Sequence, residues 1–297
     1  MLRGLLRMLP ALPLCSVAMA QGPASMEWVP ATPTSLWVAE SDSVTLYLLG
    51  SIHVLRESDF PLDPRMDRAF DEAEMVLLET AIDSLGDSAV EERMLEVALL
   101  PDGTTLDEVV PEETFRRAEE ASRQLGLDPR AIQPLRPVTV AITLSMLDFE
   151  KEGFSESGID EYFYRRAEEK GVPIAYFETV EEQLDLLFRI SPELDAQFLT
   201  LTLEQLDSSE TESARMMDAW KHGDDEELDR LLNEAMAEMP TLRDRLLVER
   251  NHRWMDRLDT WLERNKDLLI VVGAGHLVGD EGLVRLLEKR GFRLRQL

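Results

Sequence analysis

Short apolar runs alternate with amphipathic segments along this chain, and the alternation predicts both strands and helices. Leu36–Ala39 and Val44–Leu49 are apolar runs separated by the polar residues 40–43, which is typical of a β-hairpin. Four further apolar runs have the length of strands: Met75–Leu78, Pro173–Phe177, Leu268–Val272 and Phe292–Leu294. The second strand of the hairpin is apolar enough to lie inside a sheet.

Most of the segments between these runs show the periodicity of helices. Asp63 suits the cap of a helix that starts at Pro64, and Met66, Ala69, Phe70 and Ala73 fall at the spacing of one buried face. Helical patterns dominate residues 91–170, residues 180–264 are almost entirely helical, and another helix covers Asp280–Arg290. The chain is therefore predicted to be α/β, with a mostly parallel central sheet flanked by helices and a large helical insertion over 180–264 that covers one edge or mouth.

The N-terminus has the features of a secretory signal peptide. Residues 1–20 carry two arginines, no acid, a short apolar stretch and the ending Ala18-Met19-Ala20. The apolar stretch is too short to span a bilayer, which takes about 20 residues. We expect cleavage after Ala20, an extended lead-in over 21–34, a single domain over 35–297, and a periplasmic or secreted protein with no stable membrane span.

Composition narrows the possible partners and stabilising features. The net charge is −28, and it becomes −30 without the signal segment, which holds two of the 31 basic residues and none of the 59 acidic ones. Such a charge repels nucleic acid, so no nucleic-acid partner is expected. The single cysteine, Cys15, lies in the signal segment. The mature chain is therefore expected to fold without disulfides or cysteine-bound metal.

Three predicted strands each run into a residue that can bind a metal or move a proton. Val44–Leu49 leads to His53 in a Gly-x-x-His motif, Met75–Leu78 leads to Glu79, and Leu268–Val272 leads to His276 in a second Gly-x-x-His motif. Ligands of open α/β sheets bind beyond the carboxyl ends of the strands, so these side chains are expected to converge. Gly50 and Gly273, directly after the strands that lead to His53 and His276, are expected to allow a sharp turn with positive φ and to leave room for a ligand or the facing loop.

Two histidines and a carboxylate form the ligand set of an open catalytic metal site, where the ion activates a bound water. A lone Gly-x-x-His is more often a core histidine, but the chain has four histidines and half of them share this motif. The other two, His222 and His252, lack such a setting and are expected to be structural or exposed.

Several segments resemble the TraB/GumN family: LYLLGSIHVL, VLLET, GIDEYFYRRAEEKGVPIAYFETVEEQL, ERNHRWMDRL and IVVGAGHLVGDEGLVRLLEKRGFRL. The likeness covers nearly all of the chain after residue 35. That family includes the pheromone-shutdown PrgY proteins and is similar to the Tiki metalloproteases and, more distantly, to erythromycin esterases and ChaN-like proteins. The resemblance implies a peptidase-like, divalent-metal-dependent hydrolase that uses manganese or cobalt, with zinc as a further candidate, on a peptide or other small extracytoplasmic substrate.

The resemblance also implies roles for individual residues. His53 and His276 would bind the metal, Glu79 would bind the metal or act as general base, and Arg250 would stabilise negative charge in the transition state. Glu178, in a second Glu-Thr pair, is either a second catalytic carboxylate or a surface or capping residue. Asn251 either orients Arg250 or is a polar residue on a helix surface.

Two rival enzyme classes find little support, and one rival of another kind stays open. The glycines near His276 leave too little chain for a dinucleotide-binding βαβ unit, and no Gly-x-Ser-x-Gly elbow of a serine hydrolase occurs. A protein that binds and sequesters a peptide or polysaccharide-related ligand without turnover is the alternative function.

Overall fold

The computed structural model describes residues 32–81, 87–155, 157–206 and 209–297, which belong to one compact unit. The predicted signal peptide and most of the lead-in lie outside these residues. Within the described residues, no helix has the length and apolar character needed to cross a membrane.

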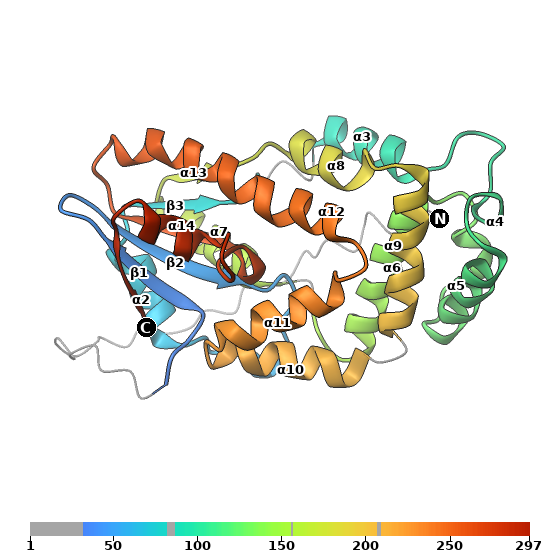
Figure 1. Ribbon diagram of the computed structural model, residues 1–297, viewed down its shortest axis with the longest axis horizontal. Helices are drawn as coiled ribbons and strands as arrows, with labels where there is room; N and C mark the ends of the chain where they lie inside the picture. The colour runs from blue at the N-terminus through green and yellow to red at the C-terminus, as the bar shows by residue number, and fades with distance from the viewer. Residues whose placement is uncertain (1–31, 82–86, 156, 207–208) are drawn as a thin grey trace. The chain divides into compact units, whose positions relative to one another are not determined.

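A mixed six-stranded sheet forms the centre of the fold (Figure 1). Its strands are β1 (Leu36–Glu40), β2 (Thr45–Ser51), β3 (Met75–Leu78), β4 (Ile174–Tyr176), β5 (Leu268–Gly273) and β6 (Arg293–Gln296). The order across the sheet is β4-β3-β5-β2-β1-β6. β4, β3, β5 and β2 are parallel to their neighbours, whereas β1 pairs antiparallel with β2 and with β6. The predicted α/β class, the hairpin and every predicted strand are confirmed, with ends that differ by a residue or two.

Helices surround the sheet and form a second packed region beyond it. They are α2 (Pro64–Glu72), α3 (Ser88–Ala98), α4 (Leu106–Val109), α5 (Glu112–Gln124), α6 (Pro137–Lys151), α7 (Ile159–Lys170), α8 (Val180–Phe188), α9 (Pro192–Leu206), α10 (Ser209–Lys221), α11 (Asp225–Ala235), α12 (Pro240–Arg243), α13 (Glu249–Leu262) and α14 (Leu283–Lys289). A π-helical turn over Asp244–Val248 joins α12 to α13, so the predicted helical block over 180–264 is also confirmed.

Two hydrophobic clusters hold these elements together. One packs α13 and α14 against a face of the sheet, with Trp254 and Leu258 of α13 against Leu77 and Ile270 of the strands. The other lies among α4, α5, α6 and α9. Figure 1 shows α14 in front of the strands and α7 behind them, and α7 contacts β3 and β5. The parallel strands are therefore buried on both faces, which explains why their sequences are continuous apolar runs.

The predicted role of the strand-end glycines is half right. Neither Gly50 nor Gly273 has a positive φ, so the expected turn conformation is wrong. Their second role stands, because a Cβ on Gly50 would lie 3.1 Å from the Cβ of Ala274. A Cβ on Gly273 would lie 3.3 Å from Oε1 of Glu79. Both glycines allow close approach where β2, β3 and β5 end.

Candidate functional site

The parallel strands deliver the predicted site residues to one edge of the sheet. Glu79 directly follows β3, Glu178 lies two residues after β4, and His276 ends a short 3₁₀ turn after β5. The backbone N–H of Glu178 donates to the carbonyl of Glu79 at 2.7 Å, so the two Glu-Thr pairs lie side by side at the ends of adjacent strands. His53 lies two residues after β2.

Arg250 ties three of these residues into one buried group. It lies on α13 and is 8% exposed. Its Nη2 donates to Oε2 of Glu79 at 2.6 Å and to Oε2 of Glu178 at 2.8 Å, and its Nε donates to Glu178 at 3.0 Å. Its Nη1 lies 3.1 Å from Nε2 of His276. The surface alternative for Glu178 is therefore wrong, because this carboxylate is 4% exposed and bound to Arg250.

His276 is held as a neutral ring of defined tautomer. Nδ2 of Asn251 donates to the carbonyls of His276 and Glu281, at 3.1 and 2.8 Å, which leaves its Oδ1 as an acceptor 2.7 Å from Nδ1 of His276. Nδ1 must then carry the proton, and Nε2 accepts from Arg250. Burial lowers the pKa of His276 to about 3, so the ring is neutral at pH 7. Both predicted roles of Asn251 are wrong, because it is 2% exposed and orients His276 instead of Arg250.

Glu79 stays charged despite its burial. The backbone N–H of Gly273 donates to its Oε1 at 2.7 Å, and the amide of Gln183 donates to its Oε2 at 3.3 Å. Burial alone raises the pKa of Glu79, but the facing His276, Arg250 and His53 together with the Gly273 N–H lower it to about 2. At pH 7 His276 is neutral, so the charged form of Glu79 is then stabilised by Arg250, by His53 and by the Gly273 N–H.

His53 differs from His276 in exposure and in charge. Its side chain is 70% exposed, and its Nδ1 lies 3.2 Å from the carboxylate of Asp160, near the start of α7. The charge of Asp160 and its hydrogen bond raise the pKa of His53 to about 9; Glu79 adds a smaller increase, and Arg250 opposes it. His53 is thus within electrostatic range of the buried group, and its Nε2 is not used by the bond to Asp160.

Gly158 allows this pairing. A Cβ at Gly158 would lie 2.4 Å from the carbonyl oxygen of Ile52 and 2.5 Å from the carbonyl carbon of His53. The N–H of Ile159 donates to the same Ile52 oxygen at 3.1 Å. The first turn of α7 therefore packs directly on the backbone of the His53 loop, and this contact places Asp160 beside the ring.

Aromatic side chains pack against Arg250 and His276 in the buried group. Trp254 is fully buried, stacks on Phe177 with ring centroids 4.9 Å apart and lies 4.3 Å from the His276 ring. The Arg250 guanidinium lies 4.6 Å above the Trp254 ring, in cation–π contact. The positions of Arg250 and His276 are thus set by packing as well as by hydrogen bonds.

The predicted metal ligands suit a divalent ion chemically, but their arrangement does not fit one. Nε2 of His276 and Oε1 of Glu79 converge to 3.8 Å, while Nη1 of Arg250 lies against the nitrogen that would bind the ion. Among the described residues, no group of three His, Cys, Asp or Glu side chains is placed to hold a metal. Metal binding by His53, Glu79 and His276 stays a prediction.

Sequence reasoning missed two residues and placed two others correctly. Asp160 contacts His53, and Gln183 contacts Glu79. The sequence showed only that Asp160 lies near the start of the helix after Gly158, and Gln183 near the start of the helix after β4. His222 and His252 are 59% and 57% exposed, with Asp218 and Glu281 as their partners. Both were expected to be structural or exposed, and this is confirmed.

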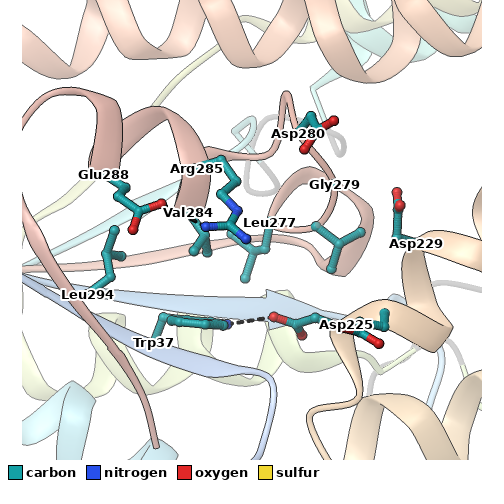
Figure 2. A pocket seen from close by; sticks show the side chains of 12 residues that line it. Trp37, Asp225, Asp229, Leu277, Gly279, Asp280, Val284, Arg285, Glu288 and Leu294 are labelled. Carbon is teal, nitrogen blue, oxygen red and sulfur yellow. Dashed lines mark hydrogen bonds and ion pairs between the residues drawn. The ribbon is translucent and has the colours of Figure 1, made fainter.

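A hollow is lined in part by Leu277–Asp280, the residues directly after His276, and none of the predicted site residues lines it. Figure 2 shows Trp37 below Leu277 and Val284, with Asp225 at the end of its indole and Asp229, Asp280 and Glu288 around it. The volume is about 390 Å³. Nε1 of Trp37 donates to Asp225 at 2.9 Å, and burial raises the pKa of Asp225 to about 6.

Comparison with known families matches residues 35–296 to the TraB/PrgY/gumN family. No curated protein and no solved structure matches the chain.

Proposed function

Because this chain belongs to the TraB/PrgY/gumN family and carries a buried charged group at the ends of parallel strands, we propose that it is a peptidase-like hydrolase. One observation carries the proposal. Glu79 and His276 each lie within hydrogen-bond distance of Arg250. This group lies next to the more exposed His53, which is paired with the carboxylate of Asp160. Such preorganised charge is costly to bury and is concentrated at functional sites.

The roles follow from exposure and protonation. His53 is the solvent-facing group, and Asp160 holds its Nδ1 so that Nε2 can exchange a proton with a substrate or water. Arg250 stabilises negative charge that develops on the reacting carbonyl oxygen through its own charge, since its N–H groups already donate to Glu79, Glu178, His276 and the carbonyl of Leu246. Glu79 and Glu178 fix Arg250, and His276, neutral and oriented by Asn251, gives the site an unprotonated nitrogen.

Dependence on a divalent ion, with manganese or cobalt before zinc, remains part of the proposal on the strength of the donor types His53, Glu79 and His276. An ion at such a site supplies an activated water. Because the described arrangement does not fit an ion, none of the roles above is assigned to one. We also propose that the protein acts outside the cytoplasm, on the basis of residues 1–20.

The test is a peptide-library cleavage assay on protein purified without chelator, on the same protein after chelation, and on chelated protein resupplied with manganese, cobalt or zinc. His53→Ala and His276→Ala are expected to lose cleavage by a factor of about 100 or more. His252→Ala is the matched control, since this exposed histidine lies outside the cluster and is expected to cleave like the wild type. Restoration by one metal would support metal dependence, and chelator-resistant cleavage would contradict it.

Absence of cleavage in every metal condition would overturn the hydrolase proposal. If the wild type then still bound peptides and His53→Ala did not, the non-catalytic binding protein would be the better account. Equal cleavage by wild type and His53→Ala would remove the proposed site from the reaction.

A further inference from the structure

Another hollow, with a mostly apolar lining, lies beside the loop that carries His53. Its volume is about 180 Å³, and its apolar lining consists chiefly of Ile52, Val54, Phe149, Phe154, Met216 and Met217. A cavity of about 150 Å³ lined by such side chains is large enough to hold benzene. The space therefore matches one aromatic or branched aliphatic side chain.

The position of this cavity connects it to the proposed reaction. Ile52 and Val54 are the two chain neighbours of His53, so the cavity begins about one residue length, roughly 4 Å, from the His53 backbone. A peptide residue whose side chain entered the cavity would therefore lie alongside the loop that carries His53.

The cavity wall and the His53 partner belong to the same short stretch of chain. Phe154 lines the cavity and Asp160 holds His53. Between them, the N–H and hydroxyl of Ser155 both donate to the carbonyl of Leu55, at 2.8 and 2.9 Å. The N–H of Ile159 then donates to the carbonyl of Ile52. The cavity and His53 are thus held in a fixed relation by backbone bonds on both sides of the loop.

Two polar side chains of the lining already have partners within the protein. The hydroxyl of Thr202 donates to the carbonyl of Phe198 at 2.9 Å, and the amide of Gln205 donates to the carbonyl of Ala235 at 3.1 Å. Asp148 is the charged residue of the lining, and the whole chain carries a net charge of −28. An acidic side chain is therefore excluded, while an uncharged apolar one gains from burial.

We propose that this cavity is the specificity pocket of the hydrolase and takes a Phe- or Leu-sized side chain of a peptide substrate next to the bond that is cut. The inference rests on the proposed function. Methionine walls suit this task because their unbranched side chains adapt to ligands of slightly different shape.

The first test compares peptides that differ at one position in the library assay. Phe or Leu at the preferred position is expected to give a kcat/KM about 100-fold higher than Ala, with Glu lower still. Met216→Trp, which places a bulkier side chain in the cavity wall, is expected to abolish the preference. Met94→Trp makes the same change at a half-buried methionine of α3 that does not line the cavity, and should retain it. No preference for Phe or Leu over Ala would overturn the inference.

A second test is independent of turnover. N-acetyl-phenylalaninamide and N-acetyl-alaninamide are titrated into the full protein labelled with ¹³C in its methionine methyl groups. The phenylalanine compound is expected to shift the Met216 and Met217 signals at a concentration at least tenfold lower than the alanine compound, without moving Met94. Equal responses, or none at Met216 and Met217, would overturn the pocket even if cleavage is found. The predicted shifts without cleavage would overturn the hydrolase proposal alone.

Discussion

Two carboxylates near the ends of the sheet are both withdrawn from water, and their acidities move in opposite directions. Glu79 faces Arg250, and its pKa falls to about 2. Asp225 faces the indole of Trp37, and its pKa rises to about 6. Burial favours the neutral acid in both places. The difference shows that the neighbouring cations and donors, Arg250 among them, and not the depth of the site, decide which carboxylate stays charged.

The cations of the two regions are used differently. Arg250 is shared by Glu79 and Glu178, so the permanent charge lies inside the group. In the hollow lined by Trp37 and Asp225, the cation of the described lining is Arg285, and it donates to Glu288 at 2.8 Å. Asp225 therefore keeps only the neutral donor of Trp37. Three predictions test this contrast through folding stability.

The largest effect is expected from Arg250→Ala. Removing the guanidinium leaves Glu79 and Glu178 buried without their cation, which costs about 3–5 kcal/mol of unfolding free energy. Urea unfolding at pH 7 measures the loss. Arg116→Ala is the control, because it breaks an ion pair with Glu113 in which both side chains are about two-thirds exposed, and no measurable change is expected. A loss for Arg250→Ala no larger than that of the control would contradict the shared-cation account.

Asn251→Ala is expected to have an intermediate effect. It removes the acceptor for Nδ1 of His276 and the donors to two carbonyls, which costs about 1–3 kcal/mol. ¹⁵N NMR should show His276 protonated at Nδ1 in the wild type and a mixture of tautomers in the variant. Asn233→Ala, at an exposed position of α11, should alter neither stability nor tautomer. An unchanged tautomer in Asn251→Ala would mean that Arg250 alone orients the ring.

The smallest effect is a gain, from Asp225→Asn. With a folded pKa near 6 against an ordinary value of 3.8, the folded state holds the proton more tightly. Stability is therefore lost as the pH rises from about 4 through 6, and the full cost remains at pH 7. Asparagine stays neutral and still accepts from Trp37, so the variant should be more stable at pH 7 by about 1–2 kcal/mol after allowance for partial exposure. Thermal unfolding at pH 4 and pH 7 measures this gain, and an equal pH dependence in both proteins would contradict the assignment.

The sequence was most informative where the chemistry follows a strand directly. The apolar runs predicted the strands, and the rule that parallel strands end at one edge brought Glu79 and His276 together. Glu178 could be recognised only as a possibility, because the pairing of β3 with β4, which makes it the neighbour of Glu79, joins segments almost 100 residues apart. Such long-range pairing has no local signal.

The residues that were missed or misassigned lie on helices. Asp160 reaches His53 only because α7 packs on the His53 loop at Gly158, and Asn251 reaches His276 only because α13 crosses the end of β5 with that face inward. Helical periodicity gives the buried face of a helix but not its partner. The arrangement of the metal donors was likewise beyond the sequence, since the place of Arg250 depends on the packing of α13 on the sheet.

The central claim is that Arg250 keeps Glu79 charged inside the site while Asp225 lacks an equivalent cation. A ¹³C NMR titration of side-chain carboxyl groups tests both residues in one experiment. The carboxyl signal of Glu79 is expected to stay that of an ionised group from pH 7 down to about pH 4, while that of Asp225 titrates with a midpoint near 6. Titration of Glu79 above its ordinary pKa of 4.5, or of Asp225 near 3.8, would contradict the account.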